Sequence, residues 1–106
     1  MLSVRRDPDG RTLVVAGEID LASAGELVQA AKSVGEGCSR LNLRGVTFID
    51  STGIRGLIDL ARSANADLEL VGVQPQVRRV LDLVGLEAHL PLRVLDASEE
   101  PDRGER

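Results

Sequence analysis

The sequence predicts an α/β fold: one small domain with a mixed, mainly parallel sheet and three helices. Segments of strand-like composition alternate with segments of helical apolar spacing, in the order β-β-α-β-α-β-α-β. The chain has 106 residues, which suits one domain with a modest core. Strands joined through helices are parallel, whereas two strands joined by a short turn are antiparallel. The pattern leaves open whether the helices cover one face of the sheet or both.

An antiparallel hairpin is predicted at the N-terminus. Residues 2–4 and 12–16 are apolar, and the turn-forming sequence Asp-Pro-Asp-Gly lies at residues 7–10 between them. A short turn at residues 17–19 is then expected to lead to Asp20. The hairpin should add an antiparallel edge to an otherwise parallel sheet.

The first helix is expected to begin at Ser23. Ser23 and Glu26 have the spacing of a capping box, in which each side chain bonds the backbone amide of the other residue. The apolar residues that follow have helical spacing: Ala24, Leu27, Val28 and Ala31. Glycine can adopt a positive φ, so the helix should stop near Gly35 or Gly37.

The central strand and the second helix surround the sequence Asp-Ser-Thr-Gly at residues 50–53. Residues 41–43 and 46–49 read as one strand with an interruption at residues 44–45. The helix after Ser51 should bury Ile54, Leu57, Ile58 and Ala61 and direct Arg55, Gly56, Asp59 and Arg62 outward.

The last part of the chain predicts a strand, a helix and a strand. Residues 68–73 form the strand, and Pro75 suits the first position of the helix because its missing N–H costs nothing there. The apolar stripe of this helix is Val77, Val80, Leu81 and Val84, and Gly85 should end it. Pro91 should place the final strand, residues 90–95, at a sheet edge.

The composition argues against several classes of function. The formal net charge is −4 and the basic residues form no continuous patch, which argues against nucleic-acid binding. Phe48 is the only aromatic residue, so a site that stacks bases or sugars is not expected. One cysteine and one histidine, Cys38 and His89, do not make a zinc site, and no GxxxxGK[ST] or GxGxxG segment is present. We therefore expect no cofactor, no metal and no catalysis.

The sequence also predicts where the protein works. The N-terminus is charged almost at once, and no apolar run approaches the roughly 20 residues that span a bilayer. A single cysteine permits no internal disulfide, which fits a reducing compartment. We expect a cytoplasmic protein, a monomer or weak dimer, with a domain over residues 1–95 and a charged, disordered tail over residues 96–106.

Carboxylates and a hydroxyl are expected to meet at one edge of the sheet. Asp20 and Asp50 each come near the carboxyl end of a predicted strand, where binding sites of open α/β sheets gather. If those strands are neighbours, Asp20, Asp50 and Ser51 form one surface. The local chemistry of Ser51 favours a helix cap. Its alternative role is phosphate acceptor: a phosphate adds about −1.5 to −2 charges, which a helix N-terminus tolerates and neighbouring carboxylates oppose.

Three segments resemble the STAS domain family, in particular the stand-alone anti-sigma factor antagonists of bacteria. Residues 17–20 (GEID) match the family's GELD-type segment, with Ile for the usual Leu, and residues 48–54 (FIDSTGI) match its F-x-D-S-[ST]-G-[LI] segment. Residues 73–81 and 85–86 are similar to its later x-x-P-x-V-x-[KR]-x-[LF]…[ST]GL stretch. The resemblance covers about residues 12–95. Many members carry a final helix, for which the charged tail offers little apolar surface.

The resemblance implies a partner-switching protein. An anti-sigma factor serine kinase would phosphorylate Ser51, with Thr52 as a secondary acceptor, and a PP2C-type phosphatase would remove the phosphate. The unmodified form would bind the kinase, and the kinase would then release its sigma factor. The resemblance implies these partner-binding residues: Asp20, Leu21, Ser23, Asp50, Ser51, Thr52, Gly53, Arg55 and Asp59. Two alternatives stay open: a STAS-like accessory subunit docking on an ABC-transporter ATPase for lipid transport, and a weak nucleotide-binding module, against which the missing phosphate loop argues.

Overall fold

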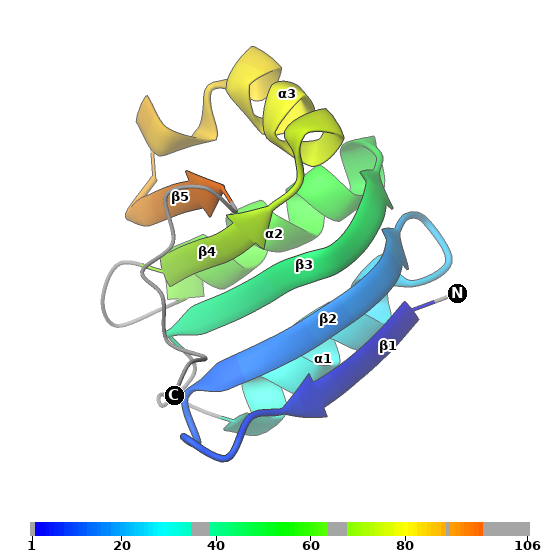
Figure 1. The fold of residues 1–106 in the computed structure, drawn as a ribbon, viewed down its shortest axis with the longest axis vertical. Helices are drawn as coiled ribbons and strands as arrows, with labels where there is room; N and C mark the ends of the chain where they lie inside the picture. The colour runs from blue at the N-terminus through cyan, green and yellow to red at the C-terminus, as the bar shows by residue number, and fades with distance from the viewer. Residues whose placement is uncertain (1, 35–38, 64–67, 89, 97–106) are drawn as a thin grey trace.

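A computed structural model describes residues 2–34, 39–63, 68–88 and 90–96 (Figure 1). The predicted order of strands and helices is confirmed, and a short 3-10 helix is added before the last strand. The elements are β1 (Leu2–Arg6), β2 (Thr12–Ile19), α1 (Ala24–Val34), β3 (Arg40–Ile49), α2 (Ser51–Ser63), β4 (Leu68–Val73), α3 (Pro75–Val84), η2 (Leu86–Ala88) and β5 (Leu92–Asp96). Residues 97–106, Cys38 and His89 lie outside the described residues, so the disorder expected for the tail stays a prediction.

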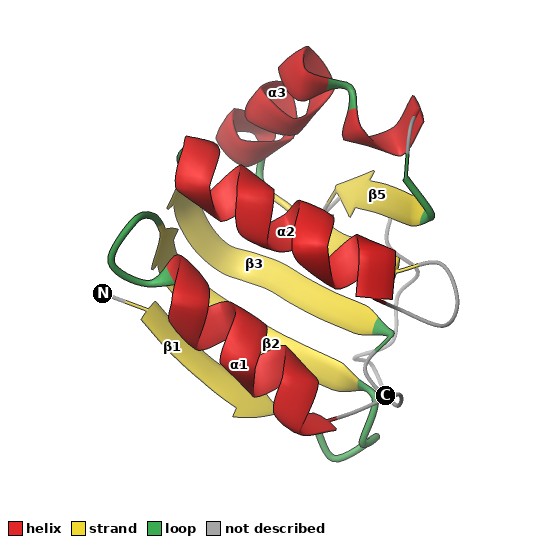
Figure 2. Ribbon diagram, turned by 180° about the vertical axis from the view of Figure 1, so that it is seen from behind, coloured by secondary structure: helices red, strands yellow, loops and turns green. Residues whose placement is uncertain are grey.

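The five strands form one sheet in the order β1-β2-β3-β4-β5. β1 pairs with β2 antiparallel, and every later neighbouring pair is parallel, as predicted. Figure 2 shows α1 and α2 side by side across one face of the sheet. In Figure 1 no described helix crosses the opposite face of β1, β2 and β3. α3 lies at the β4–β5 side of the sheet and contacts β3 and β5.

The core lies between the sheet and the helices and consists of aliphatic side chains, as the composition predicts. Its largest fully buried members are Ile19, Leu27, Leu41, Leu43, Leu57, Leu68, Leu70, Leu81, Val15, Val46, Val73 and Val77. Every strand and every helix contributes to this one cluster. Burial of aliphatic surface therefore holds the elements together.

β2 and β3 are longer and more irregular than the sequence predicts. Residues 17–19, expected as a turn, continue β2, and residues 44–45, expected as an interruption, lie inside β3. The register between the two strands shifts twice, as at β-bulges, and Gly17 has a φ of 108° beside the second shift. These shifts allow pairing to continue to the last residues of both strands.

The burial along α2 differs from the prediction at Gly56 and also at Ile58, which is only partly buried. Gly56 was expected to point outward, but it is buried. A Cβ there would lie 3.5 Å from Cγ2 of Val28 and 3.7 Å from Cβ of Ala24, both on α1. Gly56 therefore faces the neighbouring helix, a contact that the sequence of α2 alone does not reveal.

α3 begins and ends where the sequence predicts. Pro75 occupies its first turn, and Gly85 ends it with a φ of 73° while its N–H donates to the carbonyl of Leu81 at 3.0 Å. Val84, however, is 48% exposed and not part of a buried stripe. The chain turns at Gly85, and Leu86 of η2 is buried just after that turn.

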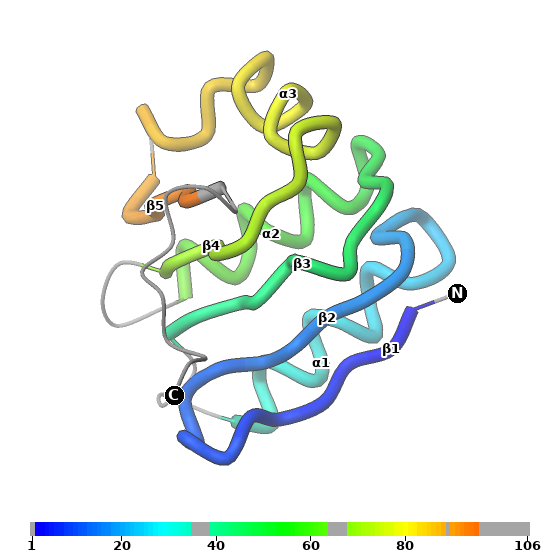
Figure 3. The backbone as a smooth tube through the Cα atoms, viewed as in Figure 1, coloured from blue at the N-terminus to red at the C-terminus, as the bar shows by residue number. Residues whose placement is uncertain are grey.

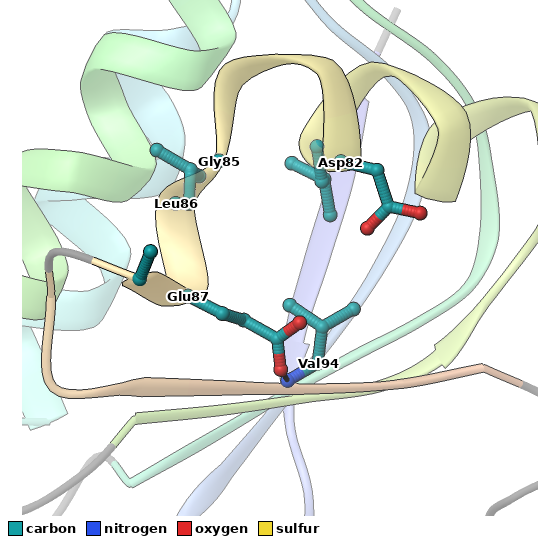
Figure 4. A pocket seen from close by; sticks show the side chains of 7 residues that line it. Asp82, Gly85, Leu86, Glu87 and Val94 are labelled. Carbon is teal, nitrogen blue, oxygen red and sulfur yellow. Dashed lines mark hydrogen bonds between the residues drawn. The ribbon is translucent and has the colours of Figure 1, made fainter.

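β5 is an edge strand, as Pro91 predicts, and side chains cover its free edge. The Val94 N–H donates to the Glu87 carboxylate at 2.9 Å (Figure 4), and the Val94 carbonyl accepts from the Arg78 guanidinium at 3.0 Å. A cavity of about 190 Å³ lies between η2 and β5, lined in part by Asp82 and Leu86. Both backbone polar groups of Val94 are thereby occupied.

Candidate functional site

The carboxyl ends of β2 and β3 lie level with each other at one edge of the sheet. Ile19 pairs with Ile49, and the Asp50 N–H donates to the Ile19 carbonyl at 3.2 Å. Asp20 directly follows one paired residue and Asp50 the other. Figure 3 traces both strand ends into the starts of α1 and α2 on the same side of the molecule. The structure therefore brings Asp20, Asp50 and Ser51 to one edge, as the sequence predicts for neighbouring strands.

Asp50, and not Ser51, caps α2. The Asp50 carboxylate accepts a hydrogen bond from the Gly53 N–H at 2.9 Å, and the Asp50 carbonyl accepts the Ile54 N–H at 2.9 Å. Ser51 is the first residue of the helix and is exposed. Its hydroxyl makes no hydrogen bond with any described residue. The favoured role of Ser51 as a cap is therefore wrong, because the preceding carboxylate satisfies the amide that a cap must satisfy.

Gly53 brings the first turn of α2 against the end of β2. A Cβ at this position would lie 2.7 Å from Cγ1 of Ile49 and 2.9 Å from Cγ2 of Ile19, and would collide with the Ile19 carbonyl oxygen. Real Cβ atoms essentially never approach so closely. Gly53 is itself buried, so its contribution to the site is to set the position of Ser51 relative to Asp20.

A hydrogen-bonded turn presents Leu21 beside these residues. The Ser23 hydroxyl donates to the Glu18 carbonyl at 2.6 Å and accepts from the Asp20 N–H at 3.0 Å. The Asp20 carboxylate accepts from the Ala22 N–H at 3.1 Å. Ser23 is only 4% exposed, and its hydroxyl bonds the turn and does not form the expected capping box. Leu21, at the tip of this turn, is 79% exposed.

The remaining predicted contacts lie on α2. Arg55 and Asp59 are exposed and Thr52 is partly exposed. Arg55 lies four residues after Ser51, a spacing that places two side chains on the same helix face. Ser51, Arg55 and Asp59 therefore follow one another along a single exposed stripe of α2.

Sequence reasoning missed Phe48 as a surface residue. The side chain of Phe48 is 49% exposed, although the sequence places Phe48 within a short apolar strand. Side chains alternate across a strand, so the burial of Ile49 directs Phe48 to the opposite face. This alternation could have predicted the exposure of Phe48 from the sequence. However, the bulge before Phe48 interrupts the alternation, so that Val46 and Ile49 are both buried although they are three residues apart.

Two further features of the described residues bear on other functions. No group of three or more His, Cys, Asp or Glu side chains among them could hold a metal ion. No helix within the described ranges is long and apolar enough to cross a membrane. Cys38 and His89 fall in the gaps of those ranges.

One family model and several solved structures resemble this chain. The model of the family described as "Mlab, STAS domain" matches residues 2–95. No curated protein matches the sequence. The solved structure of an anti-sigma factor antagonist from Mycobacterium paratuberculosis is 29% identical with a TM-score of 0.72, over 88% of this chain and 86% of that chain.

Two further solved structures share the fold. A sulfate transporter family protein from Wolinella succinogenes is 26% identical with a TM-score of 0.69, over 88% of this chain and 82% of that chain. The anti-sigma factor antagonist SpoIIAA in its unphosphorylated form is 16% identical with a TM-score of 0.59, over 78% of this chain and 83% of that chain. With the family model matching nearly the whole described sheet and all three helices, the chain belongs to the STAS domain family.

Proposed function

We propose that this protein is an anti-sigma factor antagonist that acts by partner switching. In its unmodified form it binds an anti-sigma factor serine kinase in the cytoplasm, and the kinase then releases its sigma factor. Transfer of phosphate from ATP to Ser51 ends that binding, and a PP2C-type phosphatase restores it. The protein is a substrate and a binding partner in this scheme and catalyses nothing itself.

The observation that carries the proposal is the free hydroxyl of Ser51. A kinase must reach its acceptor hydroxyl from outside, and Ser51 is exposed at the first position of α2. Because the Asp50 carboxylate binds the Gly53 N–H, no backbone amide depends on the Ser51 side chain. Phosphorylation can therefore proceed without uncapping the helix.

The charges around Ser51 support a switch that acts at the surface. Asp50 directly precedes Ser51, and Asp20 lies at the same edge because Ile19 pairs with Ile49. A phosphate would add about two negative charges to this already acidic edge, at a helix N-terminus that favours anions. The fold should therefore persist while a partner that prefers the unmodified surface is repelled. Like charges brought together at an interface cost several kcal/mol in general.

The test uses Ser51→Ala as bait. This variant cannot accept phosphate, so it should trap the kinase from the organism's extract, and the purified kinase with ATP should add one phosphate to the wild-type chain at Ser51. Thr52→Ala tests the secondary acceptor. Ser63→Ala is a matched control on the same helix, because the Ser63 hydroxyl is already bonded to the Asp59 carbonyl at 2.8 Å. Phosphate found on Ser63, or on no residue, would contradict the proposal.

A second candidate function is an accessory subunit that docks on an ABC-transporter ATPase for lipid transport. The structural neighbour at 26% identity is a sulfate transporter family protein, which favours a role in transport. The same edge of the sheet would then bind the ATPase, and no phosphate would be required. The identity of the protein trapped by Ser51→Ala separates the two functions: a kinase that modifies Ser51 supports the first, and a transporter ATPase supports the second.

A further inference from the structure

The outward side of α3 exposes apolar surface that the fold does not use. Leu83 is 82% exposed and Val84 is 48% exposed, and both lie in the last turn of this helix. Val80, one turn earlier, is only partly buried. Residues three and four apart lie on the same side of a helix, so these three side chains form one apolar stripe, which we call the α3 stripe. Apolar side chains that gather on a surface mark an interaction site more often than isolated ones do.

The other two helices cover each other, whereas α3 lies at the β4–β5 side of the sheet (Figure 2). α1 packs against α2, and the contacts of α3 are chiefly with β3, β5 and η2. Val77 and Leu81 of α3 are buried and belong to the core, so the inner side of the helix is already used. The α3 stripe is therefore left for a partner.

The charges beside the stripe are arranged so that two copies of α3 complement each other. Arg79 and Asp82 are both exposed and lie three residues apart, so they occupy one flank of the helix. Within the described ranges Arg79 forms no ion pair, and Asp82 accepts from Arg78 through Oδ1 at 3.1 Å. When two identical helices pack antiparallel about a two-fold axis, each flank meets the same flank of the other copy in reverse order. Arg79 of each copy would then lie beside Asp82 of the other.

The local balance of charge also suits self-association. The whole chain has a formal net charge of −4, so two copies repel each other in general. Over residues 75–88, however, two arginines balance one aspartate and one glutamate. Two copies can therefore meet at α3 with little local repulsion.

We propose that the α3 stripe is the contact surface of a weak homodimer, in which two copies of α3 pack antiparallel about a two-fold axis. Val80 of one copy faces Leu83 of the other, and each Arg79 meets an Asp82 carboxylate across the interface. The stripe is short, so the interface falls below the roughly 1,200 Å² of stable complexes and the dimer dissociates readily. This inference goes beyond the proposed function, because it concerns the protein alone.

Sedimentation equilibrium of the purified full chain measures the association. We expect a reversible dimer with a dissociation constant on the order of 100 μM, as suits a small interface. Leu83→Ser should weaken the dimer by about tenfold, because the serine side chain has little apolar surface to bury. Phe48→Ser is the matched control, since Phe48 is 49% exposed but lies on β3, and its dissociation constant should stay within about twofold of wild type. Circular dichroism should show the same fold for all variants.

Two charge-reversal variants test the antiparallel arrangement. Arg79→Asp leaves two acidic side chains on the flank, and Asp82→Arg leaves two basic ones. Each variant alone should therefore associate more weakly than wild type, because like charges meet across its interface. An equal mixture of the two should recover the association, since the acidic flank of one chain then meets the basic flank of the other.

The outcomes decide the inference independently of the proposed function. A wild-type chain that stays monomeric at about 1 mM would overturn the homodimer. Leu83→Ser that associates like wild type, or Phe48→Ser that loses as much affinity, would show that the α3 stripe is not the contact. A mixture of the charge-reversal variants that associates no better than either alone would overturn the antiparallel pairing. None of these results depends on which protein Ser51→Ala traps.

Discussion

At the scale of single residues, Asp50 and Ser51 have separate tasks at the start of α2. The Asp50 carboxylate accepts the Gly53 N–H, and the Ser51 hydroxyl is left free at the surface. The residue that stabilises the helix is therefore not the residue that we propose is modified. This separation allows the chemical state of Ser51 to change while α2 stays capped.

Removing each side chain should reveal that separation. Asp50→Ala leaves the Gly53 N–H without its acceptor and should lower the free energy of unfolding by about 1 kcal/mol, the usual cost of losing a helix cap. Ser51→Ala should change it by less than about 0.5 kcal/mol, as expected for an exposed residue without partners. Urea unfolding of both variants measures the difference. A larger loss in Ser51→Ala than in Asp50→Ala would show that Ser51 is the cap after all.

Gly53 is the residue at which even a methyl group should be poorly tolerated. Gly53→Ala would force the first turn of α2 away from Ile19 and Ile49, and overpacking of this kind costs about 1–3 kcal/mol. Gly25→Ala is the matched control: it lies in α1, and a Cβ there meets nothing within 4 Å. That control should stabilise the protein by about 0.4–1 kcal/mol. Thermal unfolding of both variants tests this expectation. Equal changes in the unfolding temperature of Gly53→Ala and Gly25→Ala would contradict it.

Sequence reasoning predicted where Asp20, Asp50 and Ser51 lie better than it predicted which residue caps α2. The meeting of Asp20 with Asp50 was predicted on the condition that the two preceding strands are neighbours, and the structure fulfils that condition. The exposure of Phe48 and the close approach at Gly53 cannot be inferred in that way. Both depend on how a bulged strand and a helix end pack in three dimensions, and neither leaves a periodic pattern in the sequence.

At the scale of elements, the Asp9 carboxylate makes several of the hydrogen bonds in the turn between β1 and β2. Asp9 accepts hydrogen bonds from the Arg11 N–H at 2.8 Å, the Thr12 N–H at 2.9 Å and the Thr12 hydroxyl at 2.8 Å. These hydrogen bonds hold the pKa of Asp9 below its ordinary value, and the bond from the Arg11 backbone contributes most. The hairpin turn is therefore built around an ionised Asp9.

The lowered pKa of Asp9 gives the hairpin a pH dependence of defined sign. Because the folded-state pKa lies below the unfolded one, the stabilisation is fully present above about pH 4 and is lost as the pH falls through the folded-state pKa. Asp9→Asn should thus be less stable than wild type at neutral pH. Its free energy of unfolding should also fall less than that of wild type as the pH is lowered. Unfolding measured from neutral pH to strongly acidic pH tests this. A difference between the two proteins that grows as the pH falls would have the wrong sign.

The edge of β5 depends on Glu87 in a comparable way. Glu87→Ala would free the Val94 N–H and remove a carboxylate that lies 3.6 Å from Arg78. We expect faster hydrogen exchange at the Val94 amide and a loss of about 1 kcal/mol in stability. Glu87→Gln keeps an acceptor oxygen and should retain most of the protection. Equal exchange at Val94 in wild type and Glu87→Ala would show that the carboxylate does not cover the edge.

At the scale of the whole molecule, the order of elements along the chain equals the order of strands across the sheet. Each helix therefore connects neighbouring strands, and β2 and β3 deliver their carboxyl ends to one edge. The order of elements along the chain and the mainly parallel sheet were predicted from the sequence, whereas the adjacency of β2 and β3 was only a condition there and is a finding of the structure. The sequence did not predict the close packing of α1 on α2 at Gly56 or the exposure of Val84, because both depend on contacts between elements that are distant in sequence.

At the whole-molecule scale, the packed core and the helix cap lie apart from the hydroxyl that would be modified. Ile19 and Ile49 anchor the edge in the core, Asp50 caps α2, and the Ser51 hydroxyl lies outside this framework. A phosphate on Ser51 should therefore alter the charge of the edge without altering the sheet or the helices.

The most direct test compares the affinities of two forms of the protein for the kinase trapped by Ser51→Ala. One form is unmodified, and the other carries phosphate at Ser51 alone. We expect the phosphate to weaken binding by about 100-fold or more, since like-charge contacts at an interface cost several kcal/mol. Circular dichroism should show the same fold for both forms. Equal affinity of the two forms for the kinase would contradict the central claim that the state of Ser51 controls binding.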